Sequence, residues 1–178
     1  MITPSPKGFS LIELLIVVAI ILIISAIAVP NLIHGKIAAN QASAVASLRT
    51  LQTAATTYQN TYQDGYPGGL GVLAPPGAGN PNCNAAGLID AVLAMGAKSG
   101  YLFAWTTGAA ANQIANPPLG CAVGGYTDMF SVTGTPFGYP TGTTYYCIDA
   151  TGVIRQNNAA IVATATGCPA AATPIGED

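Results

Sequence analysis

The sequence predicts an α+β fold in which one long N-terminal helix packs on a small antiparallel β-sheet. Three observations lead to this prediction. An unbroken apolar run lies near the N-terminus, apolar residues then recur at three- and four-residue steps, and short alternating segments occupy the C-terminal half. A helix with one apolar stripe and a sheet with one apolar face bury those surfaces against each other. The length of 178 residues fits a single domain with a hydrophobic appendage.

The apolar run extends from Phe9 to Val29 and is interrupted by one acid, Glu13. Its 21 residues would form a helix of about 31 Å, enough to cross the hydrocarbon core of a bilayer. A carboxylate at the centre of a membrane helix costs roughly 2.5–3.5 kcal/mol, and less near its edge. We therefore expect Glu13 either to have a function or to pair with another polar or charged group. Pro30 follows the run and predicts a kink, because proline lacks the backbone N–H and clashes with the preceding turn.

Helical periodicity continues beyond Pro30 to Tyr62. The predicted apolar stripe comprises Ile33, Ile37, Val45, Leu48, Leu51, Ala55, Tyr58 and Tyr62. One helix from Phe9 to Tyr62 would be roughly 80 Å long. Its first half is apolar nearly all round, which predicts an environment of lipid or of other copies, and its second half has one stripe, which predicts packing on a globular domain.

Turn-forming residues from Asp64 to Gly69 end the helix and begin a Gly/Pro-rich loop predicted over 64–84. Asn84 is predicted to cap a short helix over Ala85–Met95, with Gly96 just past its end. The expected apolar face of this short helix is Leu88, Val92 and Met95.

Alternating patterns then predict an antiparallel sheet in the C-terminal part of the chain. The predicted strands are Tyr101–Thr106, Tyr126–Thr133, Thr143–Ile148, Val153–Gln156 and Ile161–Thr164. Asp149-Ala150-Thr151-Gly152 fits a hairpin turn. Residues 107–125 and 165–178 are predicted to be loop or tail.

Four cysteines, Cys83, Cys121, Cys147 and Cys168, lie in the C-terminal part, and none forms a C-x-x-C pair. Even number and wide spacing in a membrane-targeted chain predict two disulfides in an oxidising compartment. Of the three possible pairings, Cys83–Cys121 with Cys147–Cys168 is favoured. The second bond would close a loop of about 20 residues, worth about 3 kcal/mol by loop entropy. Four free thiols are the alternative.

Charge is scarce, with five basic and seven acidic residues and a net charge of −2. No basic patch supports nucleic-acid binding by electrostatics. Weak repulsion between copies suits a protein that packs against itself, although a low-charge secreted domain has the same composition.

The chain is not predicted to be an enzyme. It has a single histidine, His34, and lacks a nucleophile-elbow motif, a phosphate-binding loop and paired carboxylates at helical spacing. Neither a cofactor nor a metal site is predicted. Asp90, Asp128 and Asp149 could offer calcium ligands, but turn or capping roles are favoured.

The block Lys7-Gly8-Phe9-Ser10-Leu11-Ile12-Glu13, with the apolar run up to Pro30, resembles the processing signal and N-terminal helix of type IV pilins and pseudopilins. The resemblance covers about 24 of 178 residues, 7–30. It implies a leader over 1–8, a membrane or filament-core helix over 9–30, an amphipathic helix over 31–62, and a pilin-like globular domain over 63–178.

The resemblance also implies how the chain is processed and assembled. A prepilin peptidase would cut between Gly8 and Phe9, and the same enzyme would methylate the new amine of Phe9. Glu13 of an incoming subunit would pair with that amine in its predecessor, and such a heterologous contact propagates as an open helical filament. Many family members have a glycine between this acid and the proline. Residues 14–29 contain none, so helix melting on assembly would depend on Pro30 and Ser25.

The implied partners are the peptidase, a pilus assembly platform and other copies of the chain. The implied locations are the bacterial inner membrane, with the N-terminus in the cytoplasm and a single membrane crossing, and then an extracellular pilus.

Two alternatives remain at this stage. The chain could be a type II secretion pseudopilin. It could also be a soluble secreted binding domain, with Lys7 in a signal-peptide n-region, Leu14–Ile24 as its apolar core and Ala26-Ile27-Ala28 as the cleavage site. An acid directly before the apolar core is unusual for such a signal and disfavours this second alternative.

Overall fold

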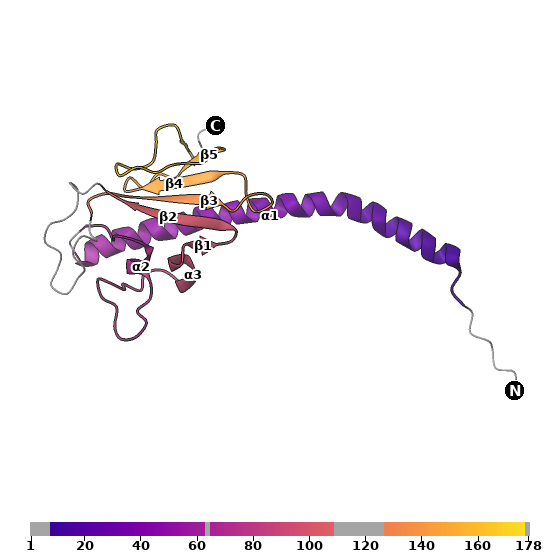
Figure 1. Cartoon of the computed structure of the whole chain (residues 1–178), viewed down its shortest axis with the longest axis horizontal. Coiled ribbons are helices and arrows are strands. Elements are labelled where there is room, and N and C mark those ends of the chain that lie inside the picture. Colours follow the sequence, from indigo (N-terminus) through magenta and orange to yellow (C-terminus); the bar gives the residue numbers. More distant parts are fainter. Residues whose placement is uncertain (1–7, 63–64, 109–126, 177–178) are drawn as a thin grey trace. The chain divides into compact units, whose positions relative to one another are not determined.

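The computed structural model describes residues 8–62, 65–108 and 127–176. The chain forms two compact units, Met1–Lys36 and Ile37–Asp178, and each is described by itself. Helix α1 (Leu11–Tyr62) contributes to both units (Figure 1). Pro30 lies inside this helix. It begins two residues later than the predicted start at Phe9, and its helical assignment continues through Pro30 without a break.

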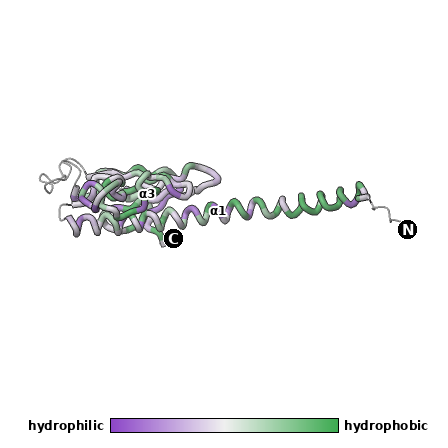
Figure 2. Tube along the Cα trace, turned by 90° about the horizontal axis from the view of Figure 1, so that it is seen from below, coloured by the Kyte–Doolittle hydropathy of each residue, from purple (hydrophilic) through white to green (hydrophobic). Residues whose placement is uncertain are grey.

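In the first unit, the large apolar side chains of α1 face solvent. From Phe9 to Leu32, these side chains are between 47% and 82% exposed. Figure 2 shows the apolar colouring along this stretch of the helix. Monomeric soluble proteins rarely expose a contiguous apolar surface of this extent, so this segment requires another environment.

The second unit contains a six-stranded antiparallel sheet whose strands follow one another in sequence order. The strands are β1 (Ala97–Lys98), β2 (Tyr101–Thr107), β3 (Phe130–Pro136), β4 (Tyr145–Asp149), β5 (Arg155–Asn157) and β6 (Thr173–Pro174). Two short helices, α2 (Leu70–Leu73) and α3 (Ala91–Ala94), precede the sheet in the chain. The predicted α+β fold, with a long helix and a small antiparallel sheet, is confirmed.

The core lies between the amphipathic half of α1 and one face of the sheet. Leu48, Leu51 and Tyr58 of α1 are fully buried in one cluster with Tyr101 and Phe130 from the strands. Burial of each such side chain contributes roughly 1.5–3 kcal/mol. The predicted stripe is therefore largely correct within the second unit. Ala44, Ser47 and Ala54 also belong to the buried face, whereas Val45 and Tyr62 are only partly buried.

The short helix predicted over Ala85–Met95 is wrong in its extent and its cap. Only α3 is helical, and its N-cap is Asp90, whose side chain accepts a hydrogen bond from the Leu93 N–H. Asn82 Oδ1 accepts hydrogen bonds from the backbone N–H groups of Asn84 and Ala85, at 2.9 and 3.2 Å. These bonds close a turn where the helix was expected to start.

The residues after that turn pair with α2 and its flank instead of forming helical bonds. Backbone N–H groups of residues 86–89 donate to carbonyls of residues 72–74, and α2 itself occupies part of the predicted loop. Val92 and Met95, which were expected on the apolar face of this helix, are 50% and 76% exposed. Gly96 ends the helix as predicted, with φ of 76° and an N–H bond of 2.9 Å to the Leu93 carbonyl.

The strand predictions are correct for β2, β4 and the turn between β4 and β5, partly correct for β3 and β5, and wrong for Ile161–Thr164. β3 begins at Phe130, and the described residues before it, 127–129, are not part of that strand. Ile161–Thr164 forms no strand. Thr164 makes an isolated bridge with Gly167, and Ile161 is buried in a small second core with Cys147 and Ala172. The last strand, β6, instead forms in the segment predicted to be tail.

Candidate processing and assembly site

The predicted cleavage position lies outside the helix. Gly8, Phe9 and Ser10 have no regular secondary structure and are exposed, and the Phe9 side chain is 82% exposed. No atom lies within 4 Å of the position that a Cβ on Gly8 would occupy. The peptide bond between Gly8 and Phe9 is therefore in the open, non-helical backbone that proteases prefer.

Glu13 already has a partner in its own chain. Its Oε2 accepts a hydrogen bond of 3.0 Å from the Ser10 backbone N–H, while the Glu13 and Leu14 N–H groups donate to the Ser10 carbonyl. This is the acidic half of a capping box, with the carboxylate at the positive end of the helix. The sequence analysis missed this bond, although the pattern Ser10-Leu11-Ile12-Glu13 is its sequence signal. Glu13 must therefore exchange one bond for another if it pairs with a second copy.

Pro30, the third predicted assembly residue, does not lie near Phe9 and Glu13. It lies 17 residues after Glu13 in α1, or about 26 Å along the helix at 1.5 Å per residue. Within the described residues, α1 is the one helix long and apolar enough to cross a membrane, by length and composition. Phe9 and Glu13 thus lie together near the start of this helix, and Pro30 lies at the far end of the apolar run.

The predicted bond between Cys147 and Cys168 is present, with the two Cα atoms 5.9 Å apart. It joins β4 to the C-terminal loop, whose Ile161 and Ala172 pack around Cys147. Cys83 is also disulfide-bonded. Its predicted partner, Cys121, lies outside the described residues. No described cysteine is a free thiol.

We expect the exported protein to contain no free thiol. Alkylation without prior reduction should leave all four cysteines unmodified, and peptide mapping should recover a fragment in which Cys147 is joined to Cys168. Alkylated Cys168 in the unreduced protein would contradict this pairing. Reduction before alkylation is the control, and it should label every cysteine.

Asp149, considered above as a calcium ligand, serves as a structural acceptor. Its side chain is buried; Oδ1 accepts from the Thr151 N–H and Oδ2 from the Cys168 N–H, both at 3.0 Å. Burial alone would raise the pKa of Asp149, but hydrogen bonds from Thr151 and Cys168, with the Arg155 charge, lower the pKa below its usual value. The carboxylate thus ties the β4–β5 turn to the disulfide loop.

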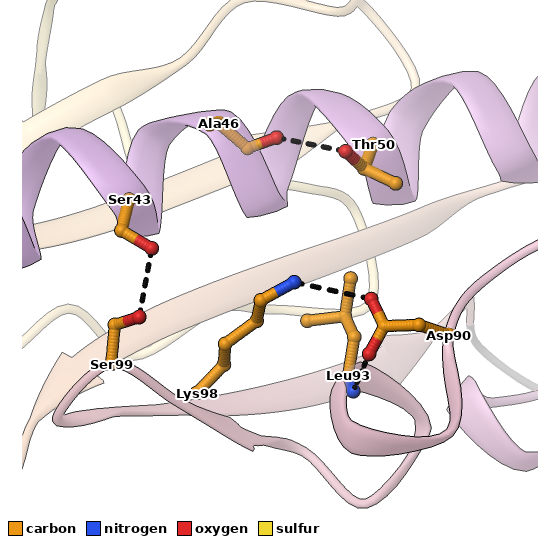
Figure 3. A network of polar contacts seen from close by, with 7 residues as sticks. All are labelled: Ser43, Ala46, Thr50, Asp90, Leu93, Lys98 and Ser99. Carbon is orange, nitrogen blue, oxygen red and sulfur yellow. Dashed lines mark hydrogen bonds and ion pairs between the residues drawn. The ribbon is translucent and has the colours of Figure 1, made fainter.

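Asp90, the second candidate ligand, caps α3. It accepts from the Leu93 N–H at 2.9 Å and pairs with Lys98 Nζ at 3.1 Å (Figure 3). The Leu93 N–H and Lys98 lower the pKa of Asp90. Asp128 is exposed. In the described ranges, no three His, Cys, Asp or Glu residues are placed to hold a metal ion. The favoured turn and capping roles are therefore the ones that Asp90 and Asp149 have.

Comparison with known proteins places a recognised motif at this site. Residues 4–29 match the family model described as the prokaryotic N-terminal methylation motif. A stretch of 55 residues is 47% identical to the type IV major pilin protein PilA of Myxococcus xanthus (strain DK1622). That stretch covers 31% of this chain and 25% of the relative, so the match spans about a quarter of the relative's length. No solved structure matches.

The two sequence matches and the fold agree with one another. The methylation motif contains Gly8, Phe9 and Glu13, and it leads into a long helix followed by an antiparallel sheet, as the pilin resemblance implies. The N-terminal part of the chain is thus similar to a type IV major pilin, and it carries the prokaryotic N-terminal methylation motif.

Proposed function

We propose that this chain is the structural subunit of a type IV pilus. It is made as a precursor with the leader 1–8, and a prepilin peptidase cuts between Gly8 and Phe9 and methylates Phe9. The subunit then waits in the bacterial inner membrane, with its N-terminus in the cytoplasm and its globular part outside. An assembly platform adds it to an extracellular helical homopolymer.

The observation that carries this proposal is that the methylation motif leads into an apolar helical segment whose large side chains are exposed. The matched residues 4–29 contain the exposed Gly8–Phe9 bond. They also contain most of the apolar side chains of the first unit, none of which is buried. A bilayer can cover these side chains in the stored subunit, and neighbouring helices can cover them in a filament. This dual fit supports a helix over 9–30 that lives in both environments, ahead of an amphipathic half over 31–62 and a globular domain over 63–178.

Assembly then requires Glu13 to change partners. Cleavage creates an ammonium on Phe9, and an ammonium or a carboxylate is costly in apolar surroundings unless it is paired. In the subunit, the Glu13 carboxylate is satisfied by the Ser10 N–H. In the filament, the amine of a preceding copy supplies a full charge, which is a stronger partner than a neutral N–H. The charge pair thereby sets the axial register of successive copies, while the apolar side chains supply packing.

The secretory alternative fits the helix poorly. Its cleavage site, Ala26-Ile27-Ala28, lies inside α1, which remains helical up to and beyond Pro30. A protease needs extended backbone, and the exposed Gly8–Phe9 bond offers it whereas residues 26–28 do not. A type II secretion pseudopilin is the second candidate, because it would share the same N-terminal processing. The Cys147–Cys168 bond and the large size of the globular unit, Ile37–Asp178, favour the pilin.

N-terminal sequencing and intact-mass analysis of the membrane-bound protein test the processing step. Removing 8 of 178 residues leaves a mature chain of 170, with Phe9 first and one added methyl group. A Gly8→Val precursor is the matched control and should stay at full length, because a β-branched side chain obstructs the scissile backbone. A mature chain that begins at Val29 would contradict the proposal and support ordinary secretion.

A further inference from the structure

Two large aromatic side chains project from the turn between β3 and β4. Phe137 and Tyr139 are 64% and 74% exposed, and they belong to the segment Phe-Gly-Tyr-Pro over 137–140, called the aromatic loop below. Other exposed apolar residues of the second unit are scattered along the chain. A surface that places two aromatic rings two residues apart has the composition of an interface anchor.

Hydrogen bonds hold the aromatic loop in place. The Phe137 N–H donates to the Gly100 carbonyl at 3.0 Å, and the Thr141 N–H donates to the Gly138 carbonyl at 2.7 Å. Asn40 of α1 donates to the Thr141 carbonyl at 2.8 Å. Because these bonds fix the loop before any partner arrives, docking would lose little conformational entropy.

A groove on α1 provides a surface that these rings could enter. It has a volume of about 430 Å³, and its lining combines small apolar side chains with the polar side chains of Gln41, Tyr146 and Gln156 and the cation of Arg49. The lining residues used here are Ala38, Ala42, Val45, Ala46, Arg49 and Ile175, called the Arg49 groove below. In the described part of the chain, the Arg49 guanidinium has neither an ion pair nor a hydrogen bond. It is thus an available cation beside an apolar wall.

Loop and groove complement each other chemically. Aromatic rings fit a cavity walled by alanine and valine, and a guanidinium stacks on the face of a tyrosine or phenylalanine ring. Within one subunit, Asn40 anchors the loop, whereas Ala38, Ala42 and Arg49 line the groove. At 100° per residue, Asn40 lies on the opposite side of α1 from Ala38. Gln41, which also lines the groove, donates to Thr143 and Thr144 just after the loop. Phe137 and Tyr139 nevertheless stay exposed, so their rings do not fill the groove within one subunit, and it is open to a ring from another molecule.

We propose that the aromatic loop of one subunit docks into the Arg49 groove of a neighbouring copy. The occupant is a second copy because every subunit carries both surfaces, and they lie at different places on it. Such a contact is heterologous and does not close on itself, so it propagates along a filament. This inference rests on the proposed pilus function and adds to it a lateral contact between globular units.

Cysteine cross-linking in filaments tests the contact. Filaments of a Tyr139→Cys/Ala46→Cys variant, sheared from cells and oxidised, should give a ladder of covalent multimers on a non-reducing gel. A Val162→Cys/Ala46→Cys variant is the matched control, since Val162 is 77% exposed but lies outside the aromatic loop. It should stay largely monomeric, because a disulfide requires Cα atoms within about 7 Å. Filaments of both variants with no ladder, or with equal ladders, would overturn the contact.

A second variant covers the case in which the cysteines prevent assembly. Phe137→Ser/Tyr139→Ser should retain Phe9 as its mature N-terminus but shift subunits from filaments to the membrane pool by at least about tenfold, as expected for loss of two anchor residues. An unchanged distribution would overturn the proposal. If the double serine variant assembles normally while Glu13→Val abolishes filaments, the docking contact is refuted and the pilus function stands. If Glu13→Val also leaves filaments intact, the proposed assembly mechanism is refuted as well.

A lipid surface is the competing binding partner for the aromatic loop. Tyr139→Cys, labelled with an environment-sensitive dye and reconstituted in phospholipid vesicles, should show the emission of a water-exposed probe. The same label should shift to the blue in filaments, because docking into the Arg49 groove of a neighbouring copy would remove the dye from bulk water. A blue shift in the vesicles without one in the filaments would assign the loop to the membrane and overturn docking on a second copy.

Discussion

Replacing Glu13 with valine should nearly abolish filaments while leaving the subunit folded in the membrane. The change removes a carboxylate from the edge of an apolar helix, so membrane insertion should be maintained or improved. The helix loses its bond to the Ser10 N–H, which weakens only the first turn. The Phe9 ammonium of the preceding copy loses its partner, and an unpaired charge in an apolar interface costs a few kcal/mol, roughly 3–5 for a fully buried pair.

Electron microscopy of sheared filaments and immunoblotting of the membrane fraction measure this outcome. Glu13→Gln separates the two roles of the side chain, because its amide oxygen can still accept from Ser10 but carries no charge. It should therefore keep the first turn and still fail to form filaments. Asp128→Asn, which removes an exposed acid from the second unit, is the control and should assemble normally. Filaments of normal number and length from Glu13→Val would show that this carboxylate does not direct assembly.

The largest effect on stability is expected from Asp149→Asn. The substituted amide keeps the shape of the side chain, but it cannot accept from both Thr151 and Cys168 as the carboxylate does. Loss of one charge-assisted bond and a buried N–H without an acceptor should lower the free energy of unfolding by about 2–3 kcal/mol. The midpoint of thermal unfolding in mild detergent should fall by roughly 5–10 °C. Asp128→Asn, the control, should change the free energy of unfolding by no more than about 0.5 kcal/mol.

The same pair of proteins should differ in their response to acid. The pKa of Asp149 is lower in the folded protein than in the unfolded chain. The carboxylate therefore stabilises the fold fully above the unfolded pKa of about 3.9, and this contribution is lost as pH falls through the folded value. Wild-type stability should drop below about pH 4, and its advantage over Asp149→Asn should narrow there. A constant difference between the two from pH 7 to pH 2 would show that Asp149 acts without its charge.

The long helix was predictable because its signals are long and agree with one another. Periodicity over the segment from Ile37 to Tyr58 places the buried face of the second unit correctly, and the β4–β5 turn follows from Asp149 and Gly152. The Gly152 N–H donates to the Asp149 carbonyl at 3.0 Å, with Gly152 at a φ of 77°. Where a local pattern is specific and no distant contact competes with it, the sequence predicts the structure well.

The errors arise where distant contacts override local preference. Asn84 has a good capping side chain, but the backbone N–H groups of residues 86–89 donate to carbonyls of residues 72–74 instead of forming helical bonds, and Asp90 caps a shorter helix. Ile161–Thr164 alternates like a strand, yet the Cys147–Cys168 bond and burial of Ile161 hold this segment as a loop. At the candidate site, the resemblance supplied the proposed assembly role of Glu13. Its bond to Ser10 has a sequence signal, Ser10-Leu11-Ile12-Glu13, but the expected role drew attention to a partner in another copy.

Mass spectrometry of filaments sheared from the cell surface tests the central claim most directly. The account predicts that this chain is a principal component of those filaments, that each copy begins with N-methylated Phe9, and that no peptide from residues 1–8 is present. Filaments that lack this chain, with the processed protein confined to the membrane fraction of the same cells, would contradict the pilus assignment.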